Sequence, residues 1–148
     1  VVGSEMVLGD GVKLKVLHAG KADQGTSKEN NESVVLKVSY GEIDFLLTGD
    51  LEKEGEMVLS EMYPDLLSSE ILKVGHHGSR TSSIAPFLDR VKPEVAVISV
   101  GRRNRFRYPS QGVIKRLLTM NCQVFRTDIS GCISIKTNGQ RLHIKSWI

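Results

Sequence analysis

The sequence predicts an α/β fold, at the border with α+β, and three observations support this class. Residues 43–48, 71–74 and 95–100 form short apolar runs, which are typical of strands buried inside a sheet. Helical patterns separate these runs, so the central part of the chain alternates between strand and helix. Further strands come before this region, and Asn138-Gly139 after it is a strong hairpin signal. We therefore expect at least one sheet with helices packed on it.

The expected strands are short apolar or alternating segments between turn residues, and they cover residues 12–17, 33–40, 43–48, 71–74, 95–100, 122–126, 132–137 and 141–144. A shorter apolar stretch at 6–8 ends at the turn signal Gly9-Asp10-Gly11. The segment 18–31 is polar, which predicts a loop, with Asn30 and Asn31 in a turn.

Helices are expected at residues 51–62, 83–91 and 110–120. Asp50, Ser83 and Ser110 stand at the N-cap positions of these three helices, because their side-chain oxygens can accept a hydrogen bond from the first turn. Pro86 suits the first turn of the second helix, where its missing N–H costs nothing. The third helix has one apolar face, formed by Val113, Ile114, Leu117 and Leu118.

Length and composition indicate a globular protein. The 148 residues are 40% hydrophobic and 25% charged, which fits one domain or a large piece of one. No apolar run reaches the roughly 18 to 20 residues that a membrane span needs. The N-terminus has neither an initiator Met nor the pattern of a signal peptide, so we expect a chain cut from a longer protein. Cys122 and Cys132 leave three readings open: two buried free thiols, a disulfide, or a reactive thiol.

Positive charge is concentrated in one segment. The net charge is only +3, but Arg102, Arg103, Arg105 and Arg107 fall within six residues. Such a patch suits a polyanionic partner, and the alternative is a solvated loop.

Two motifs place possible metal ligands where an apolar run ends. Thr48-Gly49-Asp50 closes the first run, and Gly75-His76-His77-Gly78-Ser79 follows the second. Carboxylate and imidazole are ligands of Zn²⁺ and Mn²⁺. For Asp50 the alternative role is the N-cap, and the two roles are compatible. The two histidines can reach one site only if the chain turns there, which the flanking glycines permit.

Hydroxyl side chains follow the second motif, at Ser79, Thr81, Ser82 and Ser83. Just before a helix, such groups suit either phosphate binding or simple capping. His18 and His143 stand alone, and His143 is expected to face solvent on a strand.

These motifs, together with residues 30–36 and 95–101 and with Asn104-Arg105-Phe106, resemble the C-terminal metallo-β-lactamase-like domain of the ComEC family of DNA-uptake (competence) proteins. The resemblance implies an αββα sandwich with two divalent metal ions, Zn or Mn, and phosphodiesterase or nuclease activity on DNA. It implies that Asp50 bridges the metals and that His76 or His77, with His77 favoured, ligates the second. Ser79, Thr81, Arg105 and Tyr108 would contact substrate phosphate.

Two departures from the family pattern limit this expectation. The His-x-His-x-Asp-His signature, N-terminal in the family, is absent, so the chain resembles the C-terminal half of the fold. We therefore expect it to bind metal weakly or not at all and to hydrolyse nothing alone. Tyr108-Pro109-Ser110 replaces the His-Pro-His or His-Pro-Ser of many relatives.

The leading hypothesis is a metal-dependent phosphodiester hydrolase, nuclease-like, from a DNA-uptake protein of the bacterial cell envelope. Its expected partners are DNA and the missing half of the domain, without membrane contact from this chain. A half-fold is also expected to self-associate through an exposed apolar sheet face. Two alternatives stay open: a non-catalytic nucleic-acid-binding module that uses the loop 102–107, and a small-molecule metallohydrolase of the same superfamily.

Overall fold

The computed structural model, which describes residues 1–19 and 29–148, confirms a mixed α/β architecture. Its centre is a seven-stranded sheet in sequence order, formed by β1 (Glu5–Val7), β2 (Lys13–His18), β3 (Val35–Tyr40), β4 (Ile43–Leu47), β5 (Ile71–Lys73), β6 (Val95–Ile98) and β7 (Gln123–Arg126). Strands β1 to β4 pair antiparallel, whereas β4 to β7 pair in parallel. The three apolar runs that the sequence singled out become β4, β5 and β6, and β7 adds a fourth strand to the parallel part.

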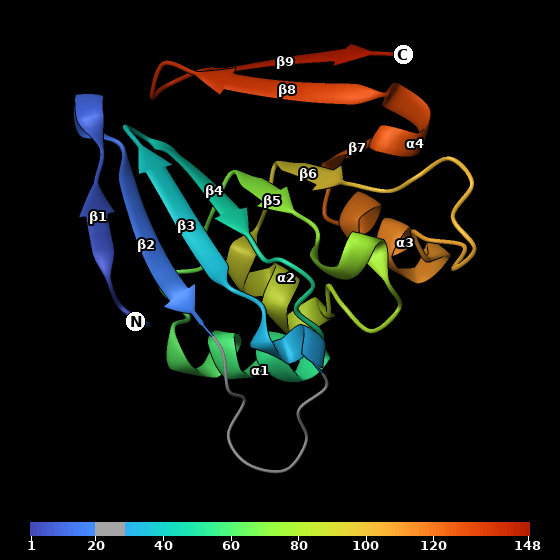
Figure 1. Cartoon of the computed structure of the whole chain (residues 1–148), viewed down its shortest axis with the longest axis horizontal. Helices are drawn as coiled ribbons and strands as arrows, with labels where there is room; N and C mark the ends of the chain where they lie inside the picture. The colour runs from blue at the N-terminus through green and yellow to red at the C-terminus, as the bar shows by residue number, and fades with distance from the viewer. Residues whose placement is uncertain (20–28) are drawn as a thin grey trace.

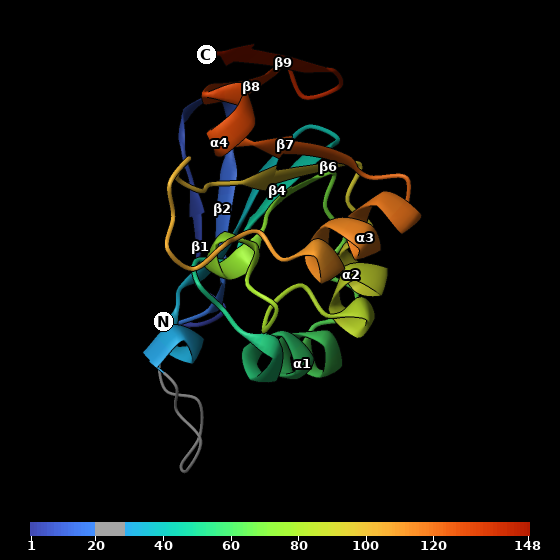
Figure 2. The ribbon, with the colours of Figure 1, turned by 90° about the vertical axis from the view of Figure 1, so that its right-hand side faces the viewer.

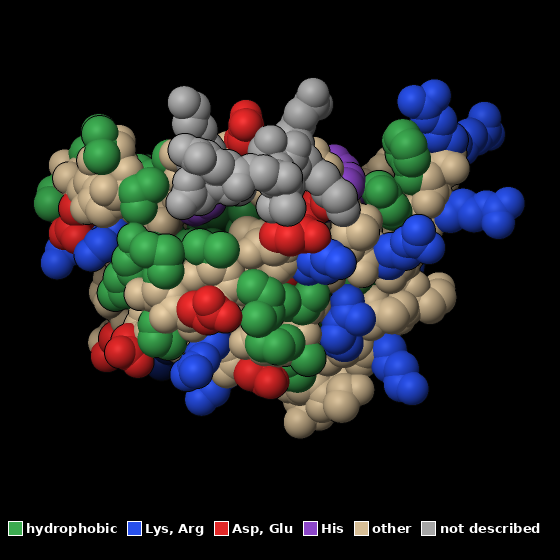
Figure 3. Space-filling view, turned by 90° about the horizontal axis from the view of Figure 1, so that it is seen from below, with side chains coloured by type: hydrophobic (Ala, Val, Ile, Leu, Met, Phe, Trp, Pro, Cys, Tyr) green, Lys and Arg blue, Asp and Glu red, His purple; other side chains and the backbone are tan. Residues whose placement is uncertain are grey.

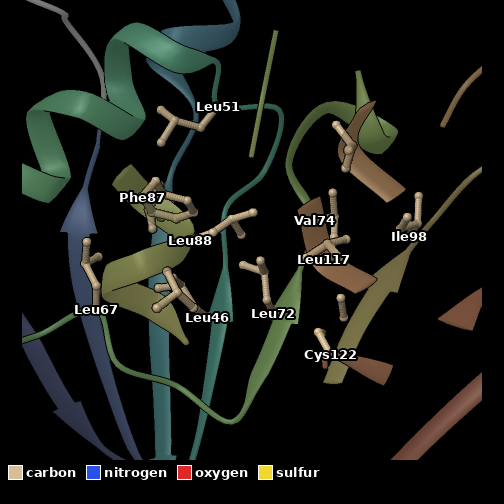
Figure 4. Packing of buried hydrophobic residues seen from close by; sticks show 14 of the residues in the cluster. Leu46, Leu51, Leu67, Leu72, Val74, Phe87, Leu88, Ile98, Leu117 and Cys122 are labelled. Carbon is tan, nitrogen blue, oxygen red and sulfur yellow. The ribbon is translucent and has the colours of Figure 1, made fainter. Parts of the chain in front are cut away.

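Three helices cover one face of this sheet: α1 (Lys53–Met62), α2 (Ala85–Val91) and α3 (Gln111–Thr119) (Figures 1 and 2). They belong to the connections between the parallel strands, as a right-handed crossover requires. Phe87, Leu88 and Leu117 from the helices pack with Leu46 and Leu72 from the sheet, and all five are fully buried (Figure 4). This layer is the main hydrophobic core.

A hairpin of β8 (Cys132–Thr137) and β9 (Leu142–Trp147) covers the opposite face, beyond the short helix α4 (Thr127–Ser130) (Figures 1 and 2). Ile43, Ile71 and Val95 form a second core with side chains of this hairpin. The Asn138-Gly139 hairpin signal is confirmed, and β9 extends further than the predicted residue 144 because the pairing continues to Trp147. The molecule therefore has a helical layer, the large sheet, and a two-stranded layer.

Two predicted N-caps are wrong. Helix α1 begins at Lys53, and Asp50 lies outside it; the buried Asn31 instead accepts hydrogen bonds from the backbone N–H groups of Glu52 and Gly55, at 3.0 and 3.4 Å. These two groups need a partner because α1 packs its first turn against the protein.

Ser83 does not cap α2, whose N-cap is Ile84. The buried Glu56 carboxylate of α1 accepts from the N–H groups of Ser83 and Ile84, at 2.6 and 2.9 Å. Pro86 in the first turn of α2 is confirmed. Ser110 caps α3 as predicted, since its hydroxyl accepts from the Val113 N–H at 3.3 Å.

The remaining local expectations have mixed outcomes. Cys122 is buried and Cys132 is exposed, and both thiols are free. Residues 20–28 of the expected loop lie outside the described part of the chain, and Glu29–Glu32 after them is a turn of 3₁₀ helix, η2. His143 is exposed on β9, as predicted. Within residues 1–19 and 29–148, no helix combines the length and the apolar character needed to cross a membrane.

Candidate functional site

The site lies where the parallel strands β4, β5 and β6 end. The chain leaves β4 at Thr48-Gly49-Asp50, leaves β5 into the 3₁₀ turn η3 (Gly75–Gly78), and leaves β6 at Ser99. Parallel strands bring their carboxyl ends to one edge of a sheet, and ligand sites of open α/β sheets are found at that edge. The structure therefore places Asp50, His76 and His77 at this edge.

His77 is held in one orientation with one ring nitrogen directed at Asp50. Its Nδ1 lies 2.7 Å from the carbonyl oxygen of Ser99, and its Nε2 lies 3.7 Å from Oδ1 of Asp50. A carbonyl oxygen only accepts, so Nδ1 carries a proton, and in the neutral imidazole Nε2 then keeps its lone pair. This is the arrangement that orients a histidine as a metal ligand. Both side chains are nearly half exposed, at 45% and 43%, so an ion can reach them.

His76 has different partners. Its Nδ1 lies 3.0 Å from Oε1 of Glu52 and 3.5 Å from Nδ2 of Asn30. Asn30 also donates to the same Glu52 oxygen at 3.2 Å, and the His76 ring packs edge-on against Tyr108, with centroids 5.5 Å apart. His76 is thus linked to a buried carboxylate and not to Asp50.

The tight turn η3 separates the two rings. His76 and His77 both have left-handed backbone conformations, with φ of 46° and 54°. The flanking glycines make this turn fit: a Cβ on Gly75 would lie 2.9 Å from the Leu51 carbonyl oxygen, and one on Gly78 would lie 2.6 Å from Cβ of Pro109. Such backbone strain in a non-glycine residue persists only where the surroundings hold it, and it is common at functional sites.

Ser79 and Thr81 belong to the hydrogen-bond network of Glu52. The hydroxyl of Thr81 donates to Oε1 of Glu52 at 3.0 Å, and the Ser79 and Thr81 hydroxyl oxygens are 3.0 Å apart. Ser79 is buried, whereas Thr81 is partly exposed. Of these two candidate phosphate contacts, Thr81 is the one at the surface.

Lys73 lies close enough to Asp50 for their charges to interact. Its ammonium donates to the Gly49 carbonyl at 3.1 Å and so holds the Thr-Gly-Asp turn. Burial lowers the pKa of Lys73, and the negative charge of Asp50 acts in the opposite direction.

A pocket of about 490 Å³ opens next to His77, and its walls are His77, Ser99, Val100, Gly101, Asn104, Phe106, Tyr108 and Thr127. Asn104 shapes the loop around it by accepting from the Tyr108 N–H at 2.7 Å and donating to the carbonyls of Gly101 and Tyr108 at 3.0 Å. Both candidate substrate contacts, Arg105 and Tyr108, belong to this loop: Tyr108 lines the pocket with His77, whereas Arg105 is exposed and lies over the Phe106 ring.

Asp50 and His77 fit part of a metal site. A carboxylate and an oriented imidazole nitrogen converge, but a protein zinc site uses three or four protein ligands. Across residues 1–19 and 29–148, no group of three His, Cys, Asp or Glu side chains is arranged to hold an ion. The described residues therefore supply two donors of such a site.

Sequence reasoning missed Glu52, Asn30 and Lys73. Asn30 belongs to a segment that carries the family resemblance, but nothing in the sequence links it to Glu52, which follows Asp50 by two residues and has no distinguishing pattern around it. Glu52 and Asn30 contact His76 only because the turns η2 and η3 fold against the start of α1.

Comparison with known proteins relates this α/β domain to bacterial competence proteins, although no protein-family model matches the chain. It is 38% identical to ComE operon protein 3 of Bacillus subtilis (strain 168) over 136 residues, which are 89% of this chain and 17% of that protein. It is 39% identical to Competence protein ComA of Neisseria gonorrhoeae over 124 residues, 84% of this chain and 18% of that protein.

Recombination protein 2 of Haemophilus influenzae (strain ATCC 51907 / DSM 11121 / KW20 / Rd) is 36% identical over 120 residues, which are 81% of this chain and 15% of that protein. The chain thus spans less than a fifth of the length of each of these relatives. The matches support a ComEC-like competence protein, which is the protein family that the sequence motifs resemble.

Proposed function

We propose that this chain is part of a metal-dependent phosphodiester hydrolase, with a metallo-β-lactamase-like fold, in a DNA-uptake protein of the bacterial cell envelope. The observation that carries the proposal is the His77 geometry: Nδ1 bound to the Ser99 carbonyl and Nε2 facing Asp50. The competence proteins it resembles supply the biological setting.

In this proposal Asp50 and His77 hold divalent metal, Zn or Mn, and the exposed edge admits the substrate. When bound, a metal at this place lowers the pKa of a water molecule and neutralises phosphate charge. As an imidazolium, His76 donates from Nδ1 to Glu52 and can donate from Nε2 to a substrate oxygen. Thr81 and Arg105 are the proposed contacts for the phosphate, and Tyr108 provides a hydroxyl where many relatives have imidazole.

The number of metal ligands in the described residues determines how tightly the isolated chain should bind metal. Two described donors fall short of one full site, and the two-metal site of the family needs still more. We propose that the other ligands come from outside the described residues, from another part of the protein or a partner chain. The isolated chain then holds metal weakly.

A second candidate function is a non-catalytic nucleic-acid-binding module. The exposure of Arg102, Arg103, Arg105 and Arg107 favours it. In Figure 3, Lys and Arg side chains gather along the right-hand side, where Figure 1 shows α3 and the loop before it. This module predicts DNA binding that ignores chelators and weakens steeply with salt. The same charge makes a polyanion a better substrate than a neutral small molecule.

Calorimetric titration of the chain with Zn²⁺ tests the metal site. We expect weak binding that falls at least tenfold in Asp50→Asn and in His77→Ala, because each variant removes one of only two donors. His143→Ala, which removes an exposed histidine on β9, is the matched control and should bind like the wild type. Equal zinc affinity in all four proteins would rule out the proposed site.

A further inference from the structure

One large apolar side chain is exposed beside the candidate site. Phe106, in the loop between β6 and α3, is 60% exposed. Its ring stacks on Tyr108 with 5.5 Å between centroids and 18° between planes, and the Arg105 guanidinium lies 4.9 Å from its centroid. The three hydrogen bonds of Asn104 fix the loop that carries them, so this aromatic surface is formed before any ligand arrives.

The two rings and His77 line the same pocket of about 490 Å³. This volume lies within the usual range of small-ligand pockets. Tyr108 lies between Phe106 and the candidate site, since its ring stacks on Phe106 and contacts the His76 ring edge-on. A planar group against this wall therefore lies next to the candidate metal-binding residues.

The surroundings of the rings identify the kind of planar group. Arg102, Arg103, Arg105 and Arg107 are all exposed on the same loop. Aromatic rings interleaved with exposed cations are typical of surfaces that bind single-stranded nucleic acid, where bases stack and the backbone meets positive charge. A duplex keeps the faces of its bases covered and cannot use such a wall.

We infer that the pocket is a stacking site for an unpaired nucleobase, with the Phe106–Tyr108 ring pair as its wall and the arginines of the loop on the adjoining phosphates. The inference rests on the proposed function and specifies its substrate as a single strand of nucleic acid. The phosphate next to the stacked base lies at the edge that Asp50 and His77 form.

Fluorescence anisotropy with the full chain in EDTA tests this site without any metal or turnover. The probes are a labelled 12-mer of thymidylate, a 12-mer of the same sugar–phosphate backbone without bases, and a 12-base-pair duplex. We expect the chain to prefer the thymidylate strand. Phe106→Ala should weaken that binding by about 5- to 150-fold, the usual cost of one lost stacking contact, and leave binding of the base-free strand unaffected. The dependence of DNA affinity on salt concentration should be the same in Phe106→Ala as in the wild type, because the variant keeps every arginine.

Two variants control for indirect effects. Phe106→Tyr keeps a stacking ring and should bind like the wild type, whereas Met62→Ala removes an equally exposed apolar side chain (61%) on α1 and should change nothing. Equal affinity for the strands with and without bases, preference for the duplex, absence of binding, or wild-type binding by Phe106→Ala would each overturn the inference. Base-dependent binding with no metal site at Asp50 and His77 would uphold it and reject the hydrolase. A metal site without base-dependent binding would do the reverse.

Discussion

His76 and His77 are neighbours in the sequence but have separate contacts. His77 is held by the Ser99 carbonyl and faces Asp50, whereas His76 contacts Glu52, whose carboxylate also accepts from Asn30. The left-handed backbone of both residues produces this separation. The sequence predicted that both reach the site, because glycines flank them. It did not predict Glu52 or Asn30, since their contacts depend on segments more than twenty residues apart.

A second carboxylate, Glu56, is buried outside the candidate site. Burial raises its pKa to about 7 from 4.5, although the N–H groups of Ile84 and Ser83 and the charge of Arg116 act in the opposite direction. The folded protein therefore holds a proton that the unfolded chain has lost between these two pH values. Its contribution to stability is fully present below about pH 4.5 and is lost as the pH rises through 7.

We predict that Glu56 makes the free energy of unfolding fall by about 3 kcal/mol between pH 4.5 and pH 8, relative to a variant without this group. Urea denaturation of the wild type and of Glu56→Gln across this range measures the difference. The variant replaces one of the two accepting oxygens with an NH₂ group, so its absolute stability also changes. The test is therefore the difference in pH dependence between the two proteins. Glu94→Gln, at an exposed position, should keep the wild-type profile. Parallel profiles for wild type and Glu56→Gln would contradict the prediction.

At the scale of elements, the sequence located α1, α2 and α3 but not the short helix α4, and it placed the N-termini of α1 and α2 wrongly. The helical pattern of residues 51–62 was enough to find α1, and Ser110 was enough to begin α3. The starts of α1 and α2 were wrong because their N–H groups are bound by distant side chains, Asn31 and Glu56, and not by the preceding residue. Local patterns carry no information about such partners.

Single substitutions of Asn31 and Asp50 test directly which of the two side chains caps the start of α1. Asn31→Ala should destabilise the protein by about 1 to 3 kcal/mol, because it leaves the N–H groups of Glu52 and Gly55, at the start of α1, without their acceptor. Asp50→Asn should cost much less, since the Asp50 side chain is 43% exposed and caps no helix. Chemical denaturation of both variants measures their free energies of unfolding. A larger loss of stability in Asp50→Asn than in Asn31→Ala would show that Asp50 is the cap.

At the scale of the molecule, the sheet has two unequal sides. The helices cover one face, and the β8–β9 hairpin packs on Ile43, Ile71 and Val95 of the other. The α/β class and the hairpin followed from periodicity and from Asn138-Gly139. The placement of the hairpin against the parallel strands did not, because it depends on contacts between segments distant in sequence.

Exposed apolar side chains remain at the first strand. Met6, Val7 and Leu8 at the β1 edge of the sheet are 59%, 65% and 45% exposed. An exposed edge with apolar side chains favours pairing with another chain. We predict concentration-dependent self-association in analytical ultracentrifugation, reduced in Val7→Lys, whose charge opposes edge pairing. A monodisperse wild-type monomer at high concentration would contradict this.

The donor count also predicts that the isolated chain does not cleave DNA. With Mn²⁺ or Zn²⁺ and a labelled single strand, product formation should stay at the level of Asp50→Ala, because two donors do not complete the site. Turnover by the wild type that Asp50→Ala abolishes would show that the chain forms a complete active site unaided.

The central claim is that Nε2 of His77 is a metal-binding nitrogen held in place by the Ser99 carbonyl. Long-range ¹H–¹⁵N NMR spectra of the histidine rings, recorded during zinc addition and assigned with His77→Ala, test it most directly. We expect Nδ1 of His77 to be protonated throughout and Nε2 to shift as zinc binds, with His143 unchanged. A His77 spectrum that does not respond to zinc, or one with the proton on Nε2, would contradict the account.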